Sequence, residues 1–202
     1  MLVNGNLRQP WAVLIGLTIV FVTTFFAATA AEYFPSTAFG DQGSSIVRTY
    51  ATRQFSIMNE PILQTEKDRD YAIRIALFRP DLDASVLRIE RTTNGSAISV
   101  FRRFQVTASG DINPTPIAVA APRIESTDVA SLITEIQRRD FFSIGETDLL
   151  VLGGPGRGIW LVEVRSQDKH HAVYRSSSEP GDPIRDIADI AARISRVTYP
   201  GN

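Results

Sequence analysis

The 202-residue sequence contains no cysteine, which excludes a disulfide framework, a thiolate nucleophile and a cysteine-ligated zinc site. A surplus of charge of one sign is also lacking, because 21 lysine and arginine residues oppose 22 aspartate and glutamate residues. Without a basic surplus, the chain lacks the long-range attraction that brings nucleic-acid phosphates to a protein. We therefore expect no nucleic-acid partner, and a fold that depends on its apolar core.

The glycine-rich stretch GGPGRGIWLVEVR at residues 153–165 lacks the features of a phosphate-binding loop. A Walker loop requires a lysine and a hydroxyl residue after its last glycine, but Gly158 is followed by Ile159. The glycines also lead into an apolar, β-branched run, whereas phosphates bind at the start of a helix. The stretch predicts a glycine-proline turn between two strands, and no nucleotide or other cofactor.

Motifs of hydrolases and metalloenzymes are absent or occur in an unsuitable context. Neither Gly-x-Ser-x-Gly nor His-Glu-x-x-His occurs. His170 and His171 are neighbours that would point to opposite faces of a strand, and we interpret them as a surface turn pair. Ser-x-x-Lys occurs at residues 166–169 in a hairpin turn instead of a helix, and Asp81 and Asp83 are typical turn residues. We predict no catalytic, cofactor-binding or metal-ligating residue.

One long hydrophobic run is present, at residues 11–31, where twenty-one residues carry no charge. A helix of about twenty residues spans the hydrocarbon layer of a membrane, so the run predicts a membrane anchor. The Ala28-Thr29-Ala30 sequence fits a signal-peptidase site, which leaves a signal peptide cleaved near Ala30 as the alternative. Because Arg8 precedes the run, we expect the domain on the extracytoplasmic side of the cell membrane, or secreted or periplasmic after cleavage.

The rest of the chain divides into two segments. Residues 32–70 mix proline, glycine and serine with short apolar clusters, which predicts a linker with an uncertain element. Within this segment, residues 45–57 fit a short helix or an edge strand. Residues 71–199 carry sustained apolar periodicity and predict one globular α+β domain.

Alternating or β-branched apolar residues predict strands at residues 71–78, 85–92, 98–106, 148–152, 159–164 and 171–176. The Asn94-Gly95 pair between the second and third strands predicts a type I′ hairpin turn, with positive φ at both residues. Residues 108–123 contain three prolines and predict a loop or an excursion along the sheet edge.

Two helices are indicated by apolar residues that recur every three or four positions. Ser126 or Thr127 can cap the first helix, and Asp182 can cap the second, in which Pro183 occupies the first turn. The apolar stripes are Val129, Leu132, Ile133 and Ile136 in the first helix, and Ile184, Ile187, Ala188, Ala191 and Ile194 in the second. The predicted fold is α+β: an antiparallel sheet with two helices packed on one face, preceded by one N-terminal hydrophobic helix.

Short motifs between residues 87 and 194 resemble those of a group of small bacterial proteins for which no activity is established. The shared motifs are a hairpin of the form LRIERTTNGSAISVFRRF, a helix ending in an aromatic pair (Phe141-Phe142), a Trp-x-x-Glu strand (residues 160–163) and a strand ending at Arg175 before a turn and a last helix. The sequence departs from the group at Ser176, where an aromatic residue is expected. The resemblance implies the fold and the lack of a known enzyme signature.

We expect a non-catalytic, exported or membrane-tethered domain that binds a protein or an envelope component. The alternative is a hydrolase-type enzyme whose site assembles only in three dimensions. Trp160, Glu163 and Arg175 form the candidate partner surface. Because Trp160 and Glu163 are three positions apart on one strand, they face opposite sides of the sheet, and we expect Trp160 under the helices and Glu163 in water. Arg175 is expected on the adjoining strand, near both.

Overall fold

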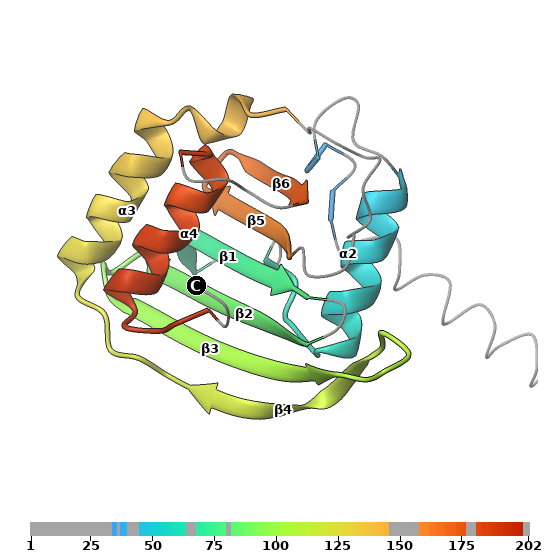
Figure 1. Cartoon of the computed structure of the whole chain (residues 1–202). Helices are drawn as coiled ribbons and strands as arrows, with labels where there is room; N and C mark the ends of the chain where they lie inside the picture. Colours follow the sequence, from blue (N-terminus) through green and yellow to red (C-terminus); the bar gives the residue numbers. More distant parts are fainter. Residues whose placement is uncertain are drawn as a thin grey trace, which may run out of the picture. The chain divides into compact units, whose positions relative to one another are not determined.

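The computed structural model of the chain describes residues 34, 35, 37–39, 45–63, 68–79, 82–145, 158–176 and 181–199 (Figure 1). These residues belong to one compact unit, Phe34–Asn202. The fold is α+β, as predicted, and the described residues form six antiparallel strands and three α-helices. The predicted anchor at residues 11–31 and the predicted strand at residues 148–152 lie outside the described residues. Within the described ranges, no helix is long and apolar enough to cross a membrane.

The sheet has the strand order β4-β3-β2-β1-β5-β6, and every neighbouring pair is antiparallel. The strands are β1 (Arg69–Phe78), β2 (Asp83–Thr92), β3 (Ala97–Val106), β4 (Ile112–Ala120), β5 (Ile159–Ser166) and β6 (His170–Ser176). The central strand β1 pairs with β2, its neighbour in sequence, and with β5, which follows α3. Residues 71–78 of β1 are buried on both faces of the sheet, so layers must cover both faces.

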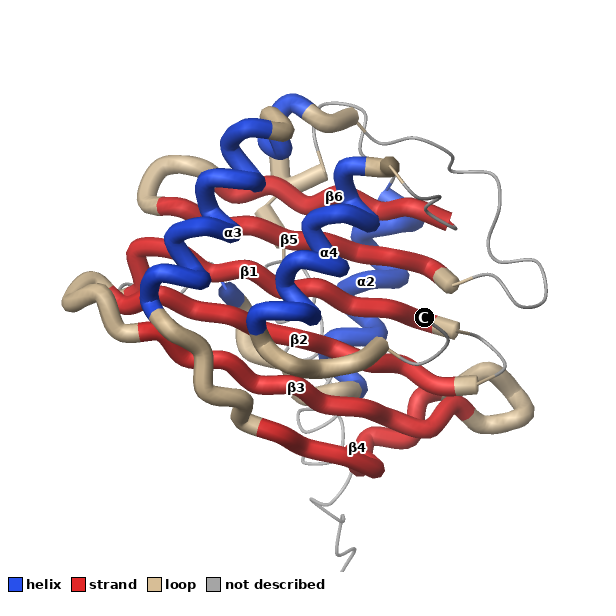
Figure 2. Tube along the Cα trace, turned by 60° about the vertical axis from the view of Figure 1, so that its left-hand side comes forward, coloured by secondary structure: helices blue, strands red, loops and turns tan. Residues whose placement is uncertain are grey.

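Helices lie on both sides of the sheet (Figure 2). The two predicted helices, α3 (Ser126–Arg138) and α4 (Pro183–Ile194), share one face, and α2 (Ser45–Ile57) lies on the opposite face. Residues 45–57, for which the sequence allowed either a helix or an edge strand, therefore form a helix. The sequence did not predict that a helix covers this second face.

The apolar stripes of α3 and α4 are buried against the sheet, as predicted. Eight stripe residues are buried: Val129, Leu132, Ile133 and Ile136 in α3, and Ile184, Ile187, Ala188 and Ala191 in α4. They pack in one core with alternate residues of β1, among them Ile73 and Ile75. Ile194, the last residue of the predicted stripe, is only partly buried.

The starts of α3 and α4 differ in their capping. Asp182 accepts a hydrogen bond from the Ile184 N–H at 2.7 Å, as predicted for α4. The predicted cap of α3 by Ser126 or Thr127 is wrong, because Glu125 is the N-cap residue and makes no side-chain cap bond. The Ser126 hydroxyl instead donates to the Gly95 carbonyl at 2.8 Å. This bond ties the start of α3 to the β2–β3 turn.

An aromatic cluster fills the space between α2 and the sheet. The Phe55 ring of α2 lies 6.0 Å from the Phe34 ring and 6.1 Å from the Phe78 ring, measured between centroids. The Ala172 N–H of β6 donates to the Ala38 carbonyl at 2.6 Å. The segment around residues 34–39, within the stretch expected as a linker, therefore packs on this face and covers part of the β6 edge.

The opposite edge of the sheet is β4. The stretch with three prolines thus follows the sheet edge, which was one of the two predicted alternatives. Pro114 and Pro116 lack a backbone donor, and the β3–β4 register shifts twice, features that protect an edge strand from pairing with another chain. Ile117 and Val119 are 54% and 63% exposed, so β4 presents apolar side chains to solvent.

Two successive hairpin turns have the same geometry. In the β2–β3 turn, the Gly95 N–H donates to the Thr92 carbonyl at 2.8 Å, and the Thr92 N–H donates to the Ser96 carbonyl at 2.9 Å. The β3–β4 turn repeats this pattern around Gly110, and both glycines have a φ of 84°. Asn94 does not have a positive φ. The predicted type I′ turn is therefore wrong: a type I turn is followed by a glycine in the left-handed region, which fits a three-residue hairpin loop.

Candidate functional site

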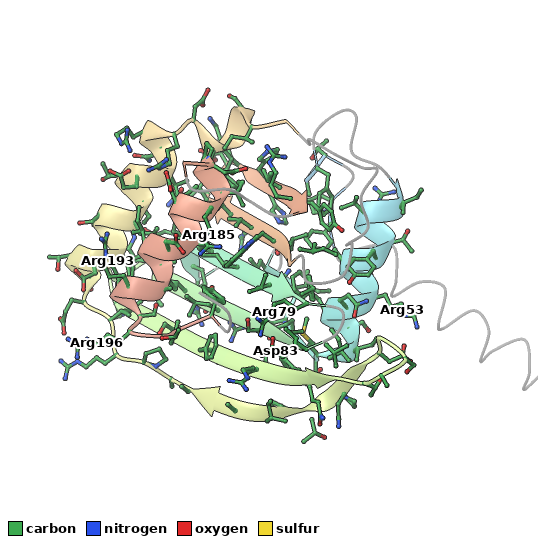
Figure 3. All side chains as sticks on the ribbon, viewed as in Figure 1. Arg53, Arg79, Asp83, Arg185, Arg193 and Arg196 are labelled. Carbon is green, nitrogen blue, oxygen red and sulfur yellow. The ribbon has the colours of Figure 1, made fainter. Side chains whose placement is uncertain are left out.

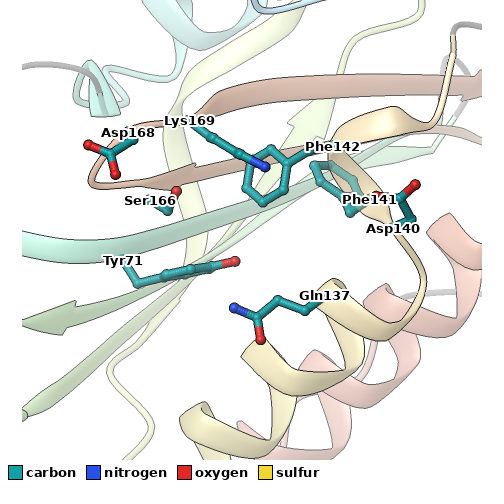
Figure 4. Close-up of a pocket in the computed structure, with 8 residues that line it drawn as sticks. All are labelled: Tyr71, Gln137, Asp140, Phe141, Phe142, Ser166, Asp168 and Lys169. Carbon is teal, nitrogen blue, oxygen red and sulfur yellow. The ribbon is translucent and has the colours of Figure 1, made fainter.

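A pocket of about 310 Å³ opens where the end of α3, the short helix η2 (Phe141–Ser143) and the β5–β6 turn meet (Figure 4). Its polar side chains at Gln137, Asp140, Asp168 and Lys169 are exposed, so the pocket faces solvent. The other lining residues are Tyr71, Phe141, Phe142 and Ser166. Concave sites with aromatic walls and a few polar groups are where proteins bind small ligands. We therefore treat this pocket as the candidate site.

The two phenylalanines reach the pocket because the chain turns sharply after α3. Asp140 has a φ of 49° and a ψ of 46°, the left-handed conformation, and leads directly into η2. The Phe141 and Phe142 rings then lie 5.8 Å apart at an interplanar angle of 81°. His171 of β6 contacts Phe141 at 5.4 Å and, through Nε2, donates to the Ile144 carbonyl at 2.8 Å. These contacts hold η2 against the sheet.

The β5–β6 turn supplies a hydroxyl and a cation to the pocket. The Ser166 N–H donates to the Lys169 carbonyl at 2.8 Å, so the Ser-x-x-Lys sequence forms a hairpin turn, as predicted. The Lys169 ammonium nitrogen lies 5.3 Å from the centre of the Phe142 ring, within the range of a cation–π contact. Lys169 thus stands at the aromatic wall of the pocket.

Tyr71 contributes a buried hydroxyl to the pocket. The residue lies opposite Ser166 in the β1–β5 ladder, and its hydroxyl points into the pocket on the side of Gln137 (Figure 4). This hydroxyl has no hydrogen-bond partner among the described residues. Leaving a buried polar group unpaired costs about 1 to 3 kcal/mol. Burial, partly offset by Arg91, raises the pKa of Tyr71 to about 12, so at neutral pH the phenol keeps its proton and can donate it.

Buried tyrosines predict a loss of stability in alkali. Burial raises the pKa of both Tyr71 and Tyr174 to about 12 and that of Tyr199 well above 10. In the unfolded chain tyrosines titrate near pH 10, so the unfolded chain binds fewer protons than the fold above that pH. The contribution of the buried, protonated tyrosines to the free energy of unfolding is complete below pH 10 and is lost as the pH rises towards 12. We expect a loss of about 1 to 2 kcal/mol for each of Tyr71 and Tyr174.

Urea unfolding followed by circular dichroism at pH 9, 10 and 11 measures this loss. Few other side chains would contribute to a change of stability between pH 9 and 11, because the chain has no cysteine and only two lysines. Tyr174→Phe should reduce the slope of unfolding free energy against pH. A slope that is flat from pH 9 to 11 would contradict the burial of these hydroxyls.

Glu163 lies in a buried ion cluster under α2, so the expectation that it faces water is wrong. Its side chain is 0% exposed. Arg74 stands directly opposite in the β1–β5 ladder, and the Arg74 Nε and Nη2 atoms donate to Glu163 Oε2, the former at 2.8 Å. His170 Nε2 lies 2.7 Å from Glu163 Oε1. Burial by itself would raise the pKa of Glu163, but Arg74 and His170 outweigh it and hold that pKa below its usual range.

Two further carboxylates on this face are buried with arginine partners. Glu60 pairs with Arg102 at 2.6 Å, and Glu90 pairs with Arg69 at 2.7 Å and with Arg88 at 3.1 Å. Burial raises the pKa of Glu60, and Arg102 opposes that rise in part. Arginine suits such pairs because its planar guanidinium offers several donors and remains charged when buried.

Three arginines of the sheet, two of them from these ion pairs, hold the segment that follows α2. Three backbone carbonyls of residues 58–63 accept hydrogen bonds from three different strands: Met58 from Arg102 at 3.3 Å, Pro61 from Arg74 at 2.8 Å, and Leu63 from Arg165 at 2.6 Å. These carbonyls lie beyond the end of α2, and hydrogen bonds from charged donors are stronger than those between neutral groups. The buried charges of this face are thus used to attach α2 and its following segment.

Asp83, which the sequence predicted as a turn residue, also forms ion pairs with two arginines. It begins β2 and is buried, where Arg79 pairs with it at 2.6 Å and Arg103 at 3.2 Å. Arg79 and Asp83 lie side by side at the ends of β1 and β2 (Figure 3). Asp81 lies outside the described residues.

Trp160 is buried on the helical face, as predicted. Its side chain lies under α4, with the Tyr199 ring centroid at 5.1 Å and the Arg185 guanidinium 5.3 Å from the ring. Arg175 is directly opposite Trp160 on β6, and it bonds to the Gly145 carbonyl at 3.1 Å and lies 3.7 Å from Asp182. Glu163 points to the other face. The three residues of the predicted partner surface therefore do not form one surface.

The histidines are on opposite faces of β6, as predicted, but the predicted surface pair is wrong. His170 pairs with the buried Glu163, and His171 is buried beside Phe141. Burial lowers the pKa of His171, which favours its neutral form. Among the described residues, no group of three or more histidine, aspartate and glutamate side chains could hold a metal ion.

The sequence did not predict the pocket, because its residues come from β1, α3, η2 and the β5–β6 turn. Two of its parts carried a signal: the aromatic pair after the first helix, and the Ser-x-x-Lys turn. Tyr71 gave none, since a tyrosine at the start of a strand is typical of a core residue.

No protein-family model and no curated protein matches the chain. The resemblance of residues 87–194 to a group of bacterial proteins stays a prediction.

Proposed function

We propose that the chain is a membrane-tethered or exported binding domain whose partner is a protein or an envelope component. The uncharged run at residues 11–31 supports tethering, with Arg8 setting the orientation. The observation that carries the binding role is the solvent-facing pocket, which combines three aromatic side chains with hydrogen-bonding groups. The buried carboxylates Glu60, Glu90 and Glu163 are paired with arginines, and the partners of Glu60 and Glu163 also bond to the segment after α2.

Cell fractionation with N-terminal sequencing tests the location. We expect the full-length chain, starting at Met1, in the membrane fraction, with the domain open to protease added outside the cytoplasmic membrane. Arg8→Glu should disturb this orientation, since it removes the positive charge before the apolar run. A soluble mature chain starting at Ala31 would contradict the anchor and support the cleaved signal. A full-length soluble chain in the cytoplasm would contradict both.

A hydrolase-type enzyme remains the alternative, and the pocket gathers Ser166, Lys169 and two aspartates that such an enzyme could use. Lys169, however, stands over the Phe142 ring, and Ser166 lies in a hairpin turn instead of at a helix start. Hydrolysis of ester and amide substrates that is abolished by Ser166→Ala would establish the enzyme and overturn the binding proposal.

A further inference from the structure

We propose that the pocket beside the β5–β6 turn binds one ring of a saccharide, as a single sugar or as a unit of a polysaccharide chain. The inference deepens the proposed function, on which it rests, by naming the chemical class of the envelope component. It follows from the size of the pocket, its aromatic walls, its hydrogen-bonding groups and the unpaired hydroxyl of Tyr71.

The pocket is small and its rim is exposed. Its volume of about 310 Å³ is at the low end of the range of roughly 300 to 1,000 Å³ found for small-molecule sites. Gln137, Asp140, Asp168 and Lys169 on its rim are exposed to solvent. The pocket therefore suits one ring, and a longer chain could continue outside it.

The walls suit a ring that has an apolar face. Phe142 is half-buried and supplies the exposed aromatic surface of the pocket, which the buried Phe141 and Tyr71 also line. The faces of aromatic rings carry negative charge density, which attracts the C–H groups on one side of a sugar ring. Ligands with polar groups on all sides would not use this surface.

The polar groups offer both donors and acceptors, which matches hydroxyls that both donate and accept. Lys169 only donates, the carboxylates of Asp140 and Asp168 only accept, and Gln137 and Ser166 do both. Two carboxylates disfavour an anion, and the ammonium group of Lys169 disfavours a cation. A neutral polyhydroxylated ligand satisfies all of these groups.

The hydroxyl of Tyr71 is the independent observation that points to a ligand. Tyr71 is 6% exposed, and its hydroxyl points into the pocket without a partner among the described residues (Figure 4). A wholly apolar ligand would leave this donor unpaired. A sugar hydroxyl or ring oxygen placed over the aromatic wall supplies the missing acceptor.

Nuclear magnetic resonance titration of the full-length chain tests the proposal. The ¹⁵N-labelled protein is held in a detergent without a sugar headgroup, and cellotriose and triacetylchitotriose are added as two separate probes. We expect saturable shifts at Gln137, Phe142 and residues 166–169 with at least one probe, and a dissociation constant on the order of a millimolar, as usual for about fifteen non-hydrogen atoms in contact.

Two matched variants assign the binding to the pocket. Tyr71→Phe removes one hydroxyl, and we expect about five- to tenfold weaker binding with no loss of thermal stability, because an unpaired buried hydroxyl does not stabilise the fold. Tyr174→Phe is the control: its hydroxyl is also buried and without a partner among the described residues, but it lies outside the pocket. The control should bind as the parent does.

The inference is overturned if neither sugar causes shifts at several tens of millimolar, or if Tyr71→Phe binds as tightly as the parent chain. Shifts caused by the dipeptide Gly-Phe, and not by the sugars, would assign the pocket to peptides and also overturn it. The titration is independent of fractionation. If the chain is membrane-bound but does not bind the sugars, only the saccharide proposal is refuted. If the chain is cytoplasmic, the proposed function is refuted.

Discussion

Replacing Glu163 by alanine should lower the free energy of unfolding by about 3 to 5 kcal/mol, because it removes the buried carboxylate that pairs with the buried Arg74 guanidinium. Both side chains are 0% exposed. Arg74 also packs over the Phe55 ring, with its guanidinium carbon 3.9 Å from the ring centroid, so it cannot turn towards water without moving α2. A Glu163 side chain in water, as the sequence predicts, would cost little when removed.

Urea unfolding of three variants at neutral pH measures this effect. Glu163→Gln keeps the shape and an acceptor for Arg74, and should cost less than Glu163→Ala. The double variant Glu163→Leu with Arg74→Met should recover most of the loss, since a buried ion pair can be replaced by apolar side chains of similar volume. Glu135→Ala removes an exposed ion pair of α3 and should leave stability unchanged within error. If Glu163→Ala behaves like Glu135→Ala, the cluster is not buried in solution.

Trp160→Ala should lower the free energy of unfolding by about 3 to 5 kcal/mol, because it removes a large side chain from a filled core. Trp160 is 3% exposed and contacts Tyr199, itself fully buried. The Tyr199 ring also lies 6.0 Å from the Phe101 ring, so the cavity would weaken contacts between β3, β5 and the segment after α4.

Chemical denaturation compares this variant with Trp160→Phe and Arg175→Ala. The phenylalanine keeps part of the contact with Tyr199 and should cost less than alanine. Arg175→Ala should cost less than Trp160→Ala, because its hydrogen bond to the Gly145 carbonyl is exposed and its distance to Asp182 is 3.7 Å. A tryptophan variant as stable as the parent chain, but unable to retain a partner in a pull-down, would show that Trp160 is a recognition residue instead of a core residue.

The sequence predicted elements that carry a local apolar pattern. In α3 and α4, the apolar stripes and the Asp182 cap identify the helices and their buried sides, since these patterns depend on neighbours within one or two turns. Alternating or β-branched apolar residues identified five of the six described strands for the same reason. It failed at β4, whose prolines and exposed side chains lack the pattern of a buried strand.

The second face of the sheet could not be predicted, because its burial depends on α2, a helix with only a weak apolar pattern of its own. The sequence predicts that Glu163 faces water, since charged side chains are seldom buried without partners. Its partner Arg74 is 89 positions away in the sequence.

By itself, the sequence determined the α+β class, the apolar sides of α3 and α4, the burial of Trp160, and the opposite orientations of Trp160 and Glu163. Each of these follows from local periodicity, which acts over a few residues. Only the tertiary structure decided that α2 covers the second face, that Glu163 is buried against Arg74, and that Tyr71, Phe142 and Lys169 line one pocket. These features depend on strand register and on packing between distant segments. A local pattern of apolar residues is compatible with more than one register and more than one packing arrangement, so it cannot specify either.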